Sequence, residues 1–394
     1  MNIRLAARAD RIKPSPTMAV TARAARLKAE GHDIIGLGAG EPDFDTPAHI
    51  TAAGMEAIRA GMTRYTEVGG TLALKDAIIA KFRRDNDLDY QRSEVMVSNG
   101  AKQVLYNLCT CLLGAGDEAI VPAPYWVSYP DMVLLSDGVP VFIDAGREQG
   151  YKITPKQLTE AISPRTRLLF LNSPCNPTGA AYTRAELKAL GRVLADHPDI
   201  VIATDDIYEH IWWGPEPFCS LVTACPGLKD RTVTINGVSK AYAMTGWRIG
   251  YCGAPERLIG AMCKVQGQST SNPCSISQHA AVIALTADQS CIAEMNSAFR
   301  RRHDFLVPAL NDLPGITCEP GWGTFYSFAN VEEAMTQRSL PDDHAFAEFL
   351  LAQAGVAVVP GSGFGAPGHM RLSFACSMQA LEAAVGRIDR ALRI

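Results

Sequence analysis

The stretch of residues 233–250 reads VTINGVSKAYAMTGWRIG and carries the strongest structural signal in the chain. Its first residues, 233–235, form a short apolar run that predicts a buried strand. Lys240 follows in a polar, glycine-containing turn, and Arg248 comes eight residues later. A lone lysine is usually a solvated side chain. A lysine at the end of a strand, with an arginine that can bind an anion close by, favours a functional amine.

Five similar apolar runs precede this strand and alternate with helical patterns, at residues 95–97, 119–121, 139–143, 168–171 and 200–203. One intervening helix is marked by the capping-box pair Thr183 and Glu186, after which leucines recur on one face. This alternation is typical of βαβ units. The sequence therefore predicts an α/β fold with a mainly parallel sheet flanked by helices.

The pattern changes beyond about residue 285. A long charged helix is expected over residues 291–310, followed by a few strands and a closing helix over 378–392. We predict a large domain over residues 47–285. Residues 1–46 and 286–394 together are expected to form a smaller α+β domain.

Composition excludes several classes of function for this chain of 394 residues. A formal net charge of −4 provides no basic field of the kind that attracts nucleic acid. The N-terminus lacks the apolar core of a signal peptide, and no apolar run approaches the length of a membrane span. We therefore expect a cytoplasmic protein that acts on small molecules, with neither a nucleic-acid nor a membrane partner.

The eleven cysteines are scattered in apolar surroundings, as in the segment 108–112, so they are interpreted as buried free thiols. No set of cysteines and histidines has the spacing of zinc ligands. We predict no metal site.

Polar side chains follow several of the predicted strands, where ligands bind in open parallel sheets. Gly100 and Ala101 come between a strand and a helix, whose free N–H groups could hold a phosphate. Asn176 lies in a turn fixed by two prolines, although a purely structural turn explains it equally well. Asp205, Asp206 and Tyr208 follow the strand at 200–203, and a helix cap would account for only one of the carboxylates.

These motifs resemble the class I aminotransferases, the aspartate aminotransferase family of fold-type I pyridoxal-phosphate (PLP) enzymes. The likeness covers nearly the whole chain and rests on three matches in the family's order: residues 237–250 around Lys240, Asn-x-Pro-x-Asn-Pro-Thr-Gly at 172–179, and Asp-x-x-Tyr at 205–208. The resemblance implies amino transfer between an amino acid and a 2-oxo acid by a ping-pong route.

The resemblance also implies a role for each motif residue. Lys240 would carry PLP as a Schiff base and then move the proton at the substrate Cα. Asp205 would keep the pyridine nitrogen protonated, and Asp206 is the weaker candidate by register. Asn176 and Tyr208 would hydrogen-bond the cofactor's 3′-oxygen. The remaining cofactor contacts would come from Gly100, Ala101, Ser239 and Arg248 at the phosphate, Trp126 on the ring, and Tyr65 of a neighbouring subunit in an obligate homodimer.

Substrate binding follows from the same resemblance. Arg371 would grip the α-carboxylate as a two-pronged fork, with Gly40, Asn176 and Trp126 around it. The likeness is greatest to the bacterial subgroup that acts on aspartate and, in some members, prephenate, in which Lys102 would bind the side-chain carboxylate with help from Thr17. We predict aspartate with 2-oxoglutarate.

Alternatives remain open at this point. Lys102 would have no role in specificity if it only solvates the first turn of its helix, and Trp126, Trp322 and Phe364 could then line a pocket for aromatic or varied amino acids. Trp322 either narrows the site or packs behind it. A PLP lyase or decarboxylase could use the same cofactor residues, whereas an aminotransferase-like transcription regulator would need a DNA-binding segment for which we expect no room.

Overall fold

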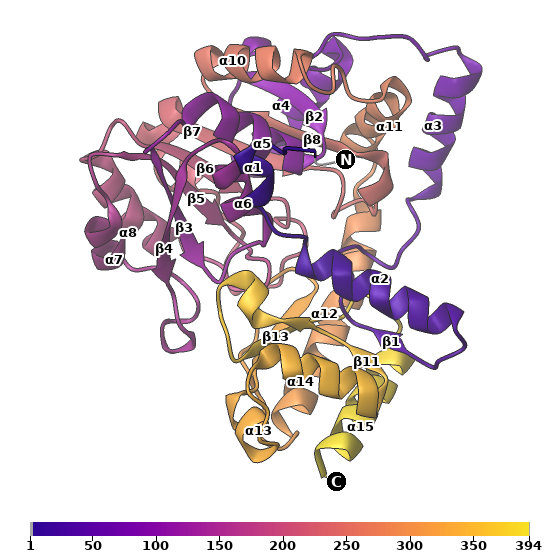
Figure 1. The fold of residues 1–394 in the computed structure, drawn as a ribbon. Coiled ribbons are helices and arrows are strands. Elements are labelled where there is room, and N and C mark those ends of the chain that lie inside the picture. Colours follow the sequence, from indigo (N-terminus) through magenta and orange to yellow (C-terminus); the bar gives the residue numbers. More distant parts are fainter. Residues whose placement is uncertain (1–2, 394) are drawn as a thin grey trace.

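The structure is a computed structural model that describes residues 3–393, and a seven-stranded sheet forms its centre (Figure 1). The sheet order is β2-β8-β7-β6-β5-β3-β4. Its strands are β2 (Val95–Asn99), β3 (Glu118–Ala123), β4 (Val139–Asp144), β5 (Thr166–Asn172), β6 (Val201–Asp205), β7 (Thr232–Gly237) and β8 (Ile249–Gly253). All six strands predicted from the sequence are present.

β8 is the strand of this seven-stranded sheet that the sequence did not predict. It pairs antiparallel with both β2 and β7, whereas the other neighbouring strands run parallel. Two of its five residues are glycines, which weaken any strand pattern. Tertiary packing requires one of them, because a Cβ on Gly250 would lie 2.0 Å from the backbone nitrogen of Ala101.

Helices cover both faces of the sheet. Alternate residues of each strand pack against the helices on one face and on the other. Val95 and Val97 pack on one side while Met96 packs on the other. The Met96 side is covered by α5 (Ala101–Leu112), α6 (Ser128–Leu135) and α10 (Glu256–Gly267). The opposite side is covered by α4 (Leu72–Asn86), α7 (Pro155–Ala161), α8 (Arg184–Ala195), α9 (Leu221–Ala224) and α11 (Ser275–Thr286), with α3 (Ala48–Arg59) packed against α11.

The C-terminal part of the chain builds a second, smaller core below this sheet (Figure 1). Its antiparallel sheet has the order β12-β13-β10-β9. The strands are β9 (Thr317–Cys318), β10 (Tyr326–Asn330), β12 (Val359–Pro360) and β13 (His369–Ser373), and the helices are α12 (Ser290–Asn311), α13 (Glu332–Gln337), α14 (Asp343–Phe349) and α15 (Met378–Arg393). The predicted long helix and closing helix correspond to α12 and α15.

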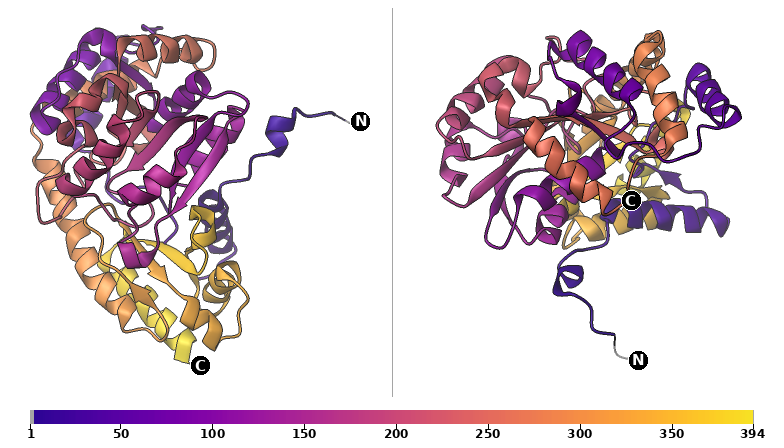
Figure 2. Two further views of the ribbon diagram at one scale, coloured as in Figure 1. Left: turned by 90° about the vertical axis from the view of Figure 1, so that its left-hand side faces the viewer. Right: turned by 90° about the horizontal axis from the view of Figure 1, so that it is seen from above.

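The N-terminal segment joins this smaller part. β1 (Ile35–Gly36) pairs in parallel with β11 (Val356–Ala357), and α2 (Pro16–Ala29) lies beside them. Before α2, the chain passes through α1 (Ala7–Asp10), which contacts α6 and from which the N-terminal residues extend outward (Figure 2). The domain limits 47–285, 1–46 and 286–394 stay a prediction, and residues 1, 2 and 394 lie outside the described part. None of the helices within residues 3–393 combines the length and the hydrophobicity that a membrane span requires.

Candidate active site

A cavity of about 460 Å³ lies between the two parts, at the carboxyl ends of the large-sheet strands. Twelve of the residues proposed from the sequence line it: Thr17, Gly40, Ala101, Lys102, Trp126, Asn176, Asp205, Tyr208, Ser239, Lys240, Arg248 and Arg371. They come from segments spread over most of the chain. The fold therefore gathers in one place the polar residues that the sequence shows only at separate strand ends.

Asp205 presents a buried carboxylate to this cavity from the end of β6. Burial raises its pKa to about 6, although the Tyr129 hydroxyl donates a hydrogen bond of 2.7 Å to its Oδ2 and acts in the opposite direction. The Asn172 amide, at the end of β5, donates to the Asp205 carbonyl oxygen at 2.8 Å. Both the side chain and the backbone of Asp205 are thus held in place.

Asp206 lies on the other side of the same turn and does not line the cavity. Its Oδ1 accepts a 2.6 Å hydrogen bond from the Thr204 hydroxyl, and burial raises its pKa well above the ordinary value. Of the two adjacent carboxylates, Asp205 is the one that can reach a ligand in the cavity.

Lys240 brings a half-buried amine into the cavity just after the end of β7. Burial is the largest cause that lowers its pKa, followed by the positive charge of Arg371, and the pKa falls to about 8. The amine donates a hydrogen bond to the carbonyl oxygen of Gly40. About a tenth of this amine is therefore unprotonated and nucleophilic at pH 7, whereas an ordinary lysine is almost entirely protonated there.

An anion site is formed where α5 begins. Gly100 has φ +82°, and a Cβ on it would lie 2.5 Å from Nη2 of Arg248. Only glycine leaves room for the guanidinium, which donates to the carbonyl oxygens of Thr245 at 3.0 Å and Asn99 at 3.2 Å. A fixed arginine and the N-terminus of a twelve-residue helix together suit a phosphate.

Arg371 lies on β13, on the side of the cavity that belongs to the smaller core. Its side chain is buried, and it donates to Asn176 Oδ1 at 2.9 Å and to the Gly38 carbonyl oxygen at 2.8 Å. The buried Nε has no hydrogen-bond partner among the described residues. A buried cation with unused donor capacity can hold a carboxylate that enters the cavity.

A second cation, Lys102, lies in the first turn of α5. Its Nζ is 4.9 Å from the centre of the Trp126 ring, and burial, followed by the charge of Arg248, lowers its pKa. Thr17, from the start of α2, lines the same cavity. Lys102 is an exposed side chain that lines the cavity, so its role in specificity stays a prediction.

Three further residues of the sequence-based prediction do not line this cavity: Tyr65, Trp322 and Phe364. The side chain of Tyr65 is 92% exposed. Trp322 packs edge-on against Trp212 and beneath the amine of Lys152, and it is not part of the cavity wall. Phe364 is buried, with its ring centre 4.9 Å from the Arg371 guanidinium.

Sequence reasoning missed three residues that shape the site. Tyr326 lines the cavity, and its hydroxyl lies 3.1 Å from the Tyr208 hydroxyl. The centre of its ring lies 4.2 Å from the Arg371 guanidinium. Tyr129 and Asn172 hold Asp205. A tyrosine in a strand or helix pattern looks like core in a sequence, so only Asn172, which belongs to the 172–179 motif, carried a signal.

The chemistry of this donor set is specific. It combines a buried amine of lowered pKa, a buried carboxylate, an anion site at a helix N-terminus and two further cations in one cavity. Such a cavity can hold a phosphorylated carbonyl compound and an amino acid side by side, with the amine positioned to react.

Comparison with known proteins identifies the family. The profile of the family Aminotransferase class I and II matches residues 32–388. An aspartate/prephenate aminotransferase of Nitrosomonas europaea is 57% identical, over 98% of this chain and 99% of its own. Among solved structures, an aspartate aminotransferase of Rhizobium meliloti has a TM-score of 0.95 and 45% identity, covering 100% of this chain and 99% of its own. One from Thermus thermophilus with maleate has a TM-score of 0.93 and 42% identity, covering 99% of this chain and 100% of its own. These matches show that the chain belongs to the class I and II aminotransferases.

Proposed function

We propose that this aminotransferase moves the amino group of L-aspartate to 2-oxoglutarate, with PLP as its cofactor. The observation that carries the proposal is the presence of two cations, Arg371 and Lys102, in the wall of the cavity that also holds Lys240. A dicarboxylic amino acid offers two carboxylates, so each cation can take one of them. The Thermus thermophilus relative was solved with maleate, which is itself a dicarboxylate.

The residues present fit PLP. Arg248, Gly100, Ala101 and Ser239 would hold the phosphate, in a cradle that a Cβ at position 100 would fill. Asp205 would pair with the ring nitrogen, and Trp126 would lie against the ring. When bound, PLP supplies an electron sink that stabilises negative charge at the substrate Cα.

The chain's own groups perform the remaining steps. Lys240 would hold the cofactor, and its amine, of pKa about 8, would then move the proton at the substrate Cα. Arg371 would orient the α-carboxylate, because Asn176 and Gly38 fix its guanidinium. Donor and acceptor use the same cavity in turn, which is the basis of a ping-pong reaction.

Prephenate is the second substrate that we propose. It is a 2-oxo acid with an additional carboxylate on its ring, so it presents the same two charges at a different spacing. Trp126 beside Lys102 offers an aromatic face next to the second cation. The Nitrosomonas europaea relative carries both substrates in its name.

A homodimer with shared active sites completes the proposal. Tyr65 is exposed in its own chain, and Met55, Ile58 and Met62 are large apolar side chains exposed on and just after α3. Burying this surface against a second copy would remove it from water and could bring Tyr65 to the partner's phosphate site. A cytoplasmic location stays a prediction.

The test is an absorption spectrum of the purified protein with PLP, before and after aspartate is added. We expect a visible absorption band of bound cofactor that survives dialysis. The band should disappear when aspartate is added, and oxaloacetate should be formed at the same time. The Lys240→Ala variant should bind PLP without this band and without turnover. A wild-type band that aspartate leaves unchanged would refute the substrate, and the absence of any band would refute the cofactor assignment.

A further inference from the structure

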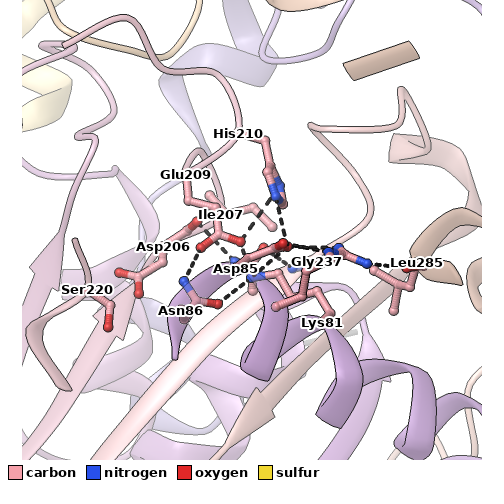
Figure 3. A network of polar contacts seen from close by, with 12 residues as sticks. Lys81, Asp85, Asn86, Asp206, Ile207, Glu209, His210, Ser220, Gly237 and Leu285 are labelled. Atoms are coloured by element: carbon pink, nitrogen blue, oxygen red, sulfur yellow. Dashed lines mark hydrogen bonds and ion pairs between the residues drawn. The ribbon is translucent and has the colours of Figure 1, made fainter. Parts of the chain in front are cut away.

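A buried polar network joins α4 to the turn that contains Asp206, Ile207 and Glu209 (Figure 3). Lys81, a wholly buried lysine of α4, forms an ion pair with the buried carboxylate of Glu209. Asn86, the last residue of α4, joins the two: it accepts from Lys81 Nζ at 2.6 Å and donates to Glu209 Oε2 at 2.6 Å. The three side chains close a ring of interactions.

The turn at residues 205–209 points its side chains in two directions. Asp205 and Tyr208 line the cavity, whereas Asp206 and Glu209 do not. Glu209 is joined to the rest of the turn by its backbone N–H, which donates to the Asp206 carbonyl oxygen at 2.9 Å. Any movement of Glu209 is therefore transmitted to the segment between the two cavity residues.

The outer end of the network reaches a partly exposed histidine. His210 Nε2 lies 3.1 Å from Asp85 Oδ2, and its Nδ1 lies 3.7 Å from Glu209 Oε1. These three residues lie close enough together to hold a metal ion. The Lys81 ammonium already neutralises Glu209 and stands where a cation would be needed, so the arrangement favours an internal ion pair over a metal site.

Stability alone does not explain this pair. Taking two charges out of water opposes folding, and apolar residues of similar size at such positions are often equally stabilising or better. A buried ion pair does, however, define one geometry, because neither charge can leave its partner without a large penalty. Burial raises the pKa of Glu209, but the Lys81 ammonium more than compensates and keeps it below its ordinary value, as expected for a permanently charged carboxylate.

We propose that Lys81, Asn86 and Glu209 are positioning residues for the reaction. Through the turn they share, they fix where Asp205 meets the cofactor ring and where Tyr208 meets its 3′-oxygen. Helix α4, which contributes no residue to the cavity wall, thereby acts on the cofactor from behind. This inference rests on the proposed function, because it concerns how PLP is held.

The test compares the PLP-loaded wild-type enzyme with the double variant Lys81→Met/Glu209→Gln, which removes both charges and leaves neither unpaired. We expect the thermal unfolding midpoint to change little, whereas kcat with aspartate should fall about tenfold to a hundredfold, as a small misplacement of reacting groups does. PLP affinity should also fall. The pH midpoint of the cofactor's visible band should rise, because a displaced Tyr208 no longer stabilises the ionised 3′-oxygen.

Two further variants sharpen the result. Asn86→Ser removes the bridging amide but keeps both charges, and it should shift the pH midpoint in the same direction by a smaller amount, even if the double variant does not fold. Arg165→Met/Glu118→Gln is the control, because this pair lies at the opposite end of the same sheet, where β3 begins. It should leave the pH midpoint and kcat unchanged.

An unchanged pH midpoint and kcat in the network variants, beside an active wild-type enzyme, would overturn the inference alone. Equal shifts in the control pair would also overturn it, since the effect would then be global. Failure of the wild-type protein to bind PLP would overturn the proposed function and this inference with it.

Discussion

The surroundings of the Lys240 amine lower its pKa and thereby make it reactive. An ordinary lysine remains protonated far above neutral pH, but desolvation and the charge of Arg371 bring the pKa of Lys240 to about 8. Only the unprotonated amine can attack a carbonyl group. The environment of this residue therefore sets the pH at which the cofactor can be captured.

We predict that covalent capture of PLP by the cofactor-free enzyme speeds up as pH rises through about 8 and then levels off. Below this pKa, each unit of pH should change the rate about tenfold, because it changes the fraction of free amine tenfold. Growth of the visible band after rapid mixing measures the rate, with Lys240→Ala as the blank. A rate that still climbs at pH 10 would mean that Lys240 behaves as an ordinary exposed lysine.

Lys102 is expected to set the preference of the enzyme for a dicarboxylic amino acid. Lys102→Ala should lower kcat/KM for aspartate about tenfold to a hundredfold, the range expected for a lost charge-assisted hydrogen bond. It should leave phenylalanine nearly unaffected, because that substrate has no second carboxylate. Lys264→Ala, which removes an exposed lysine of α10 outside the cavity, is the matched control. Equal losses for both substrates would show that Lys102 does not select the dicarboxylate.

Among the helices and strands, the sequence predicted best those ends whose backbone polar groups bond to side chains a few residues away. The capping box predicted at Thr183 is present: Thr183 Oγ1 accepts from the Glu186 N–H at 3.2 Å, and Glu186 Oε2 accepts from the Thr183 N–H at 2.8 Å. These contacts are local, so residues three positions apart suffice to predict them. β8 could not be predicted in this way, because its two glycines weaken the local strand pattern and only its pairing with β2 and β7 holds it in the sheet.

We predict that Thr183→Ala lowers the free energy of unfolding by about 1 kcal/mol, the usual loss for an N-cap threonine. The matched control is Thr159→Ala, an exposed threonine of α7 whose hydroxyl bonds only to its own helix, at the Pro155 carbonyl oxygen. Urea denaturation of the PLP-loaded enzyme measures both, and kcat should be unchanged. A loss in the control as large as that in Thr183→Ala would argue against a specific role for the cap.

For the whole molecule, the outward-facing side of α3 is the feature that a single chain leaves unexplained. Met55 is 48% and Ile58 57% exposed on this helix, and Tyr65 follows it. Such a surface is typical of an interface between subunits. If the sites are shared, two chains with different defects can repair each other.

We predict that a mixture of Lys240→Ala and Tyr65→Ala chains, unfolded and refolded together, regains activity that neither has alone. A hybrid dimer would contain one site with an intact Lys240 from one chain and an intact Tyr65 from the other. Each variant refolded alone is the control, and light scattering reports the assembly state. Dimers that form but regain no activity would show that Tyr65 does not serve the partner's site.

Features that depend on near neighbours along the chain could be predicted from the amino-acid sequence. Alternation of apolar runs with helical periodicity predicted the α/β fold. Because parallel strands place their carboxyl ends at one edge, the order of residues along the chain was enough to group Lys240, Asp205 and Asn176. Which side-chain atoms are in contact could be seen only in the folded structure. Three contacts at or near the site join residues between 45 and 128 positions apart: Tyr129 with Asp205, Tyr326 with Arg371, and Lys81 with Glu209. Side-chain packing between distant segments selects such contacts, and no local propensity encodes them.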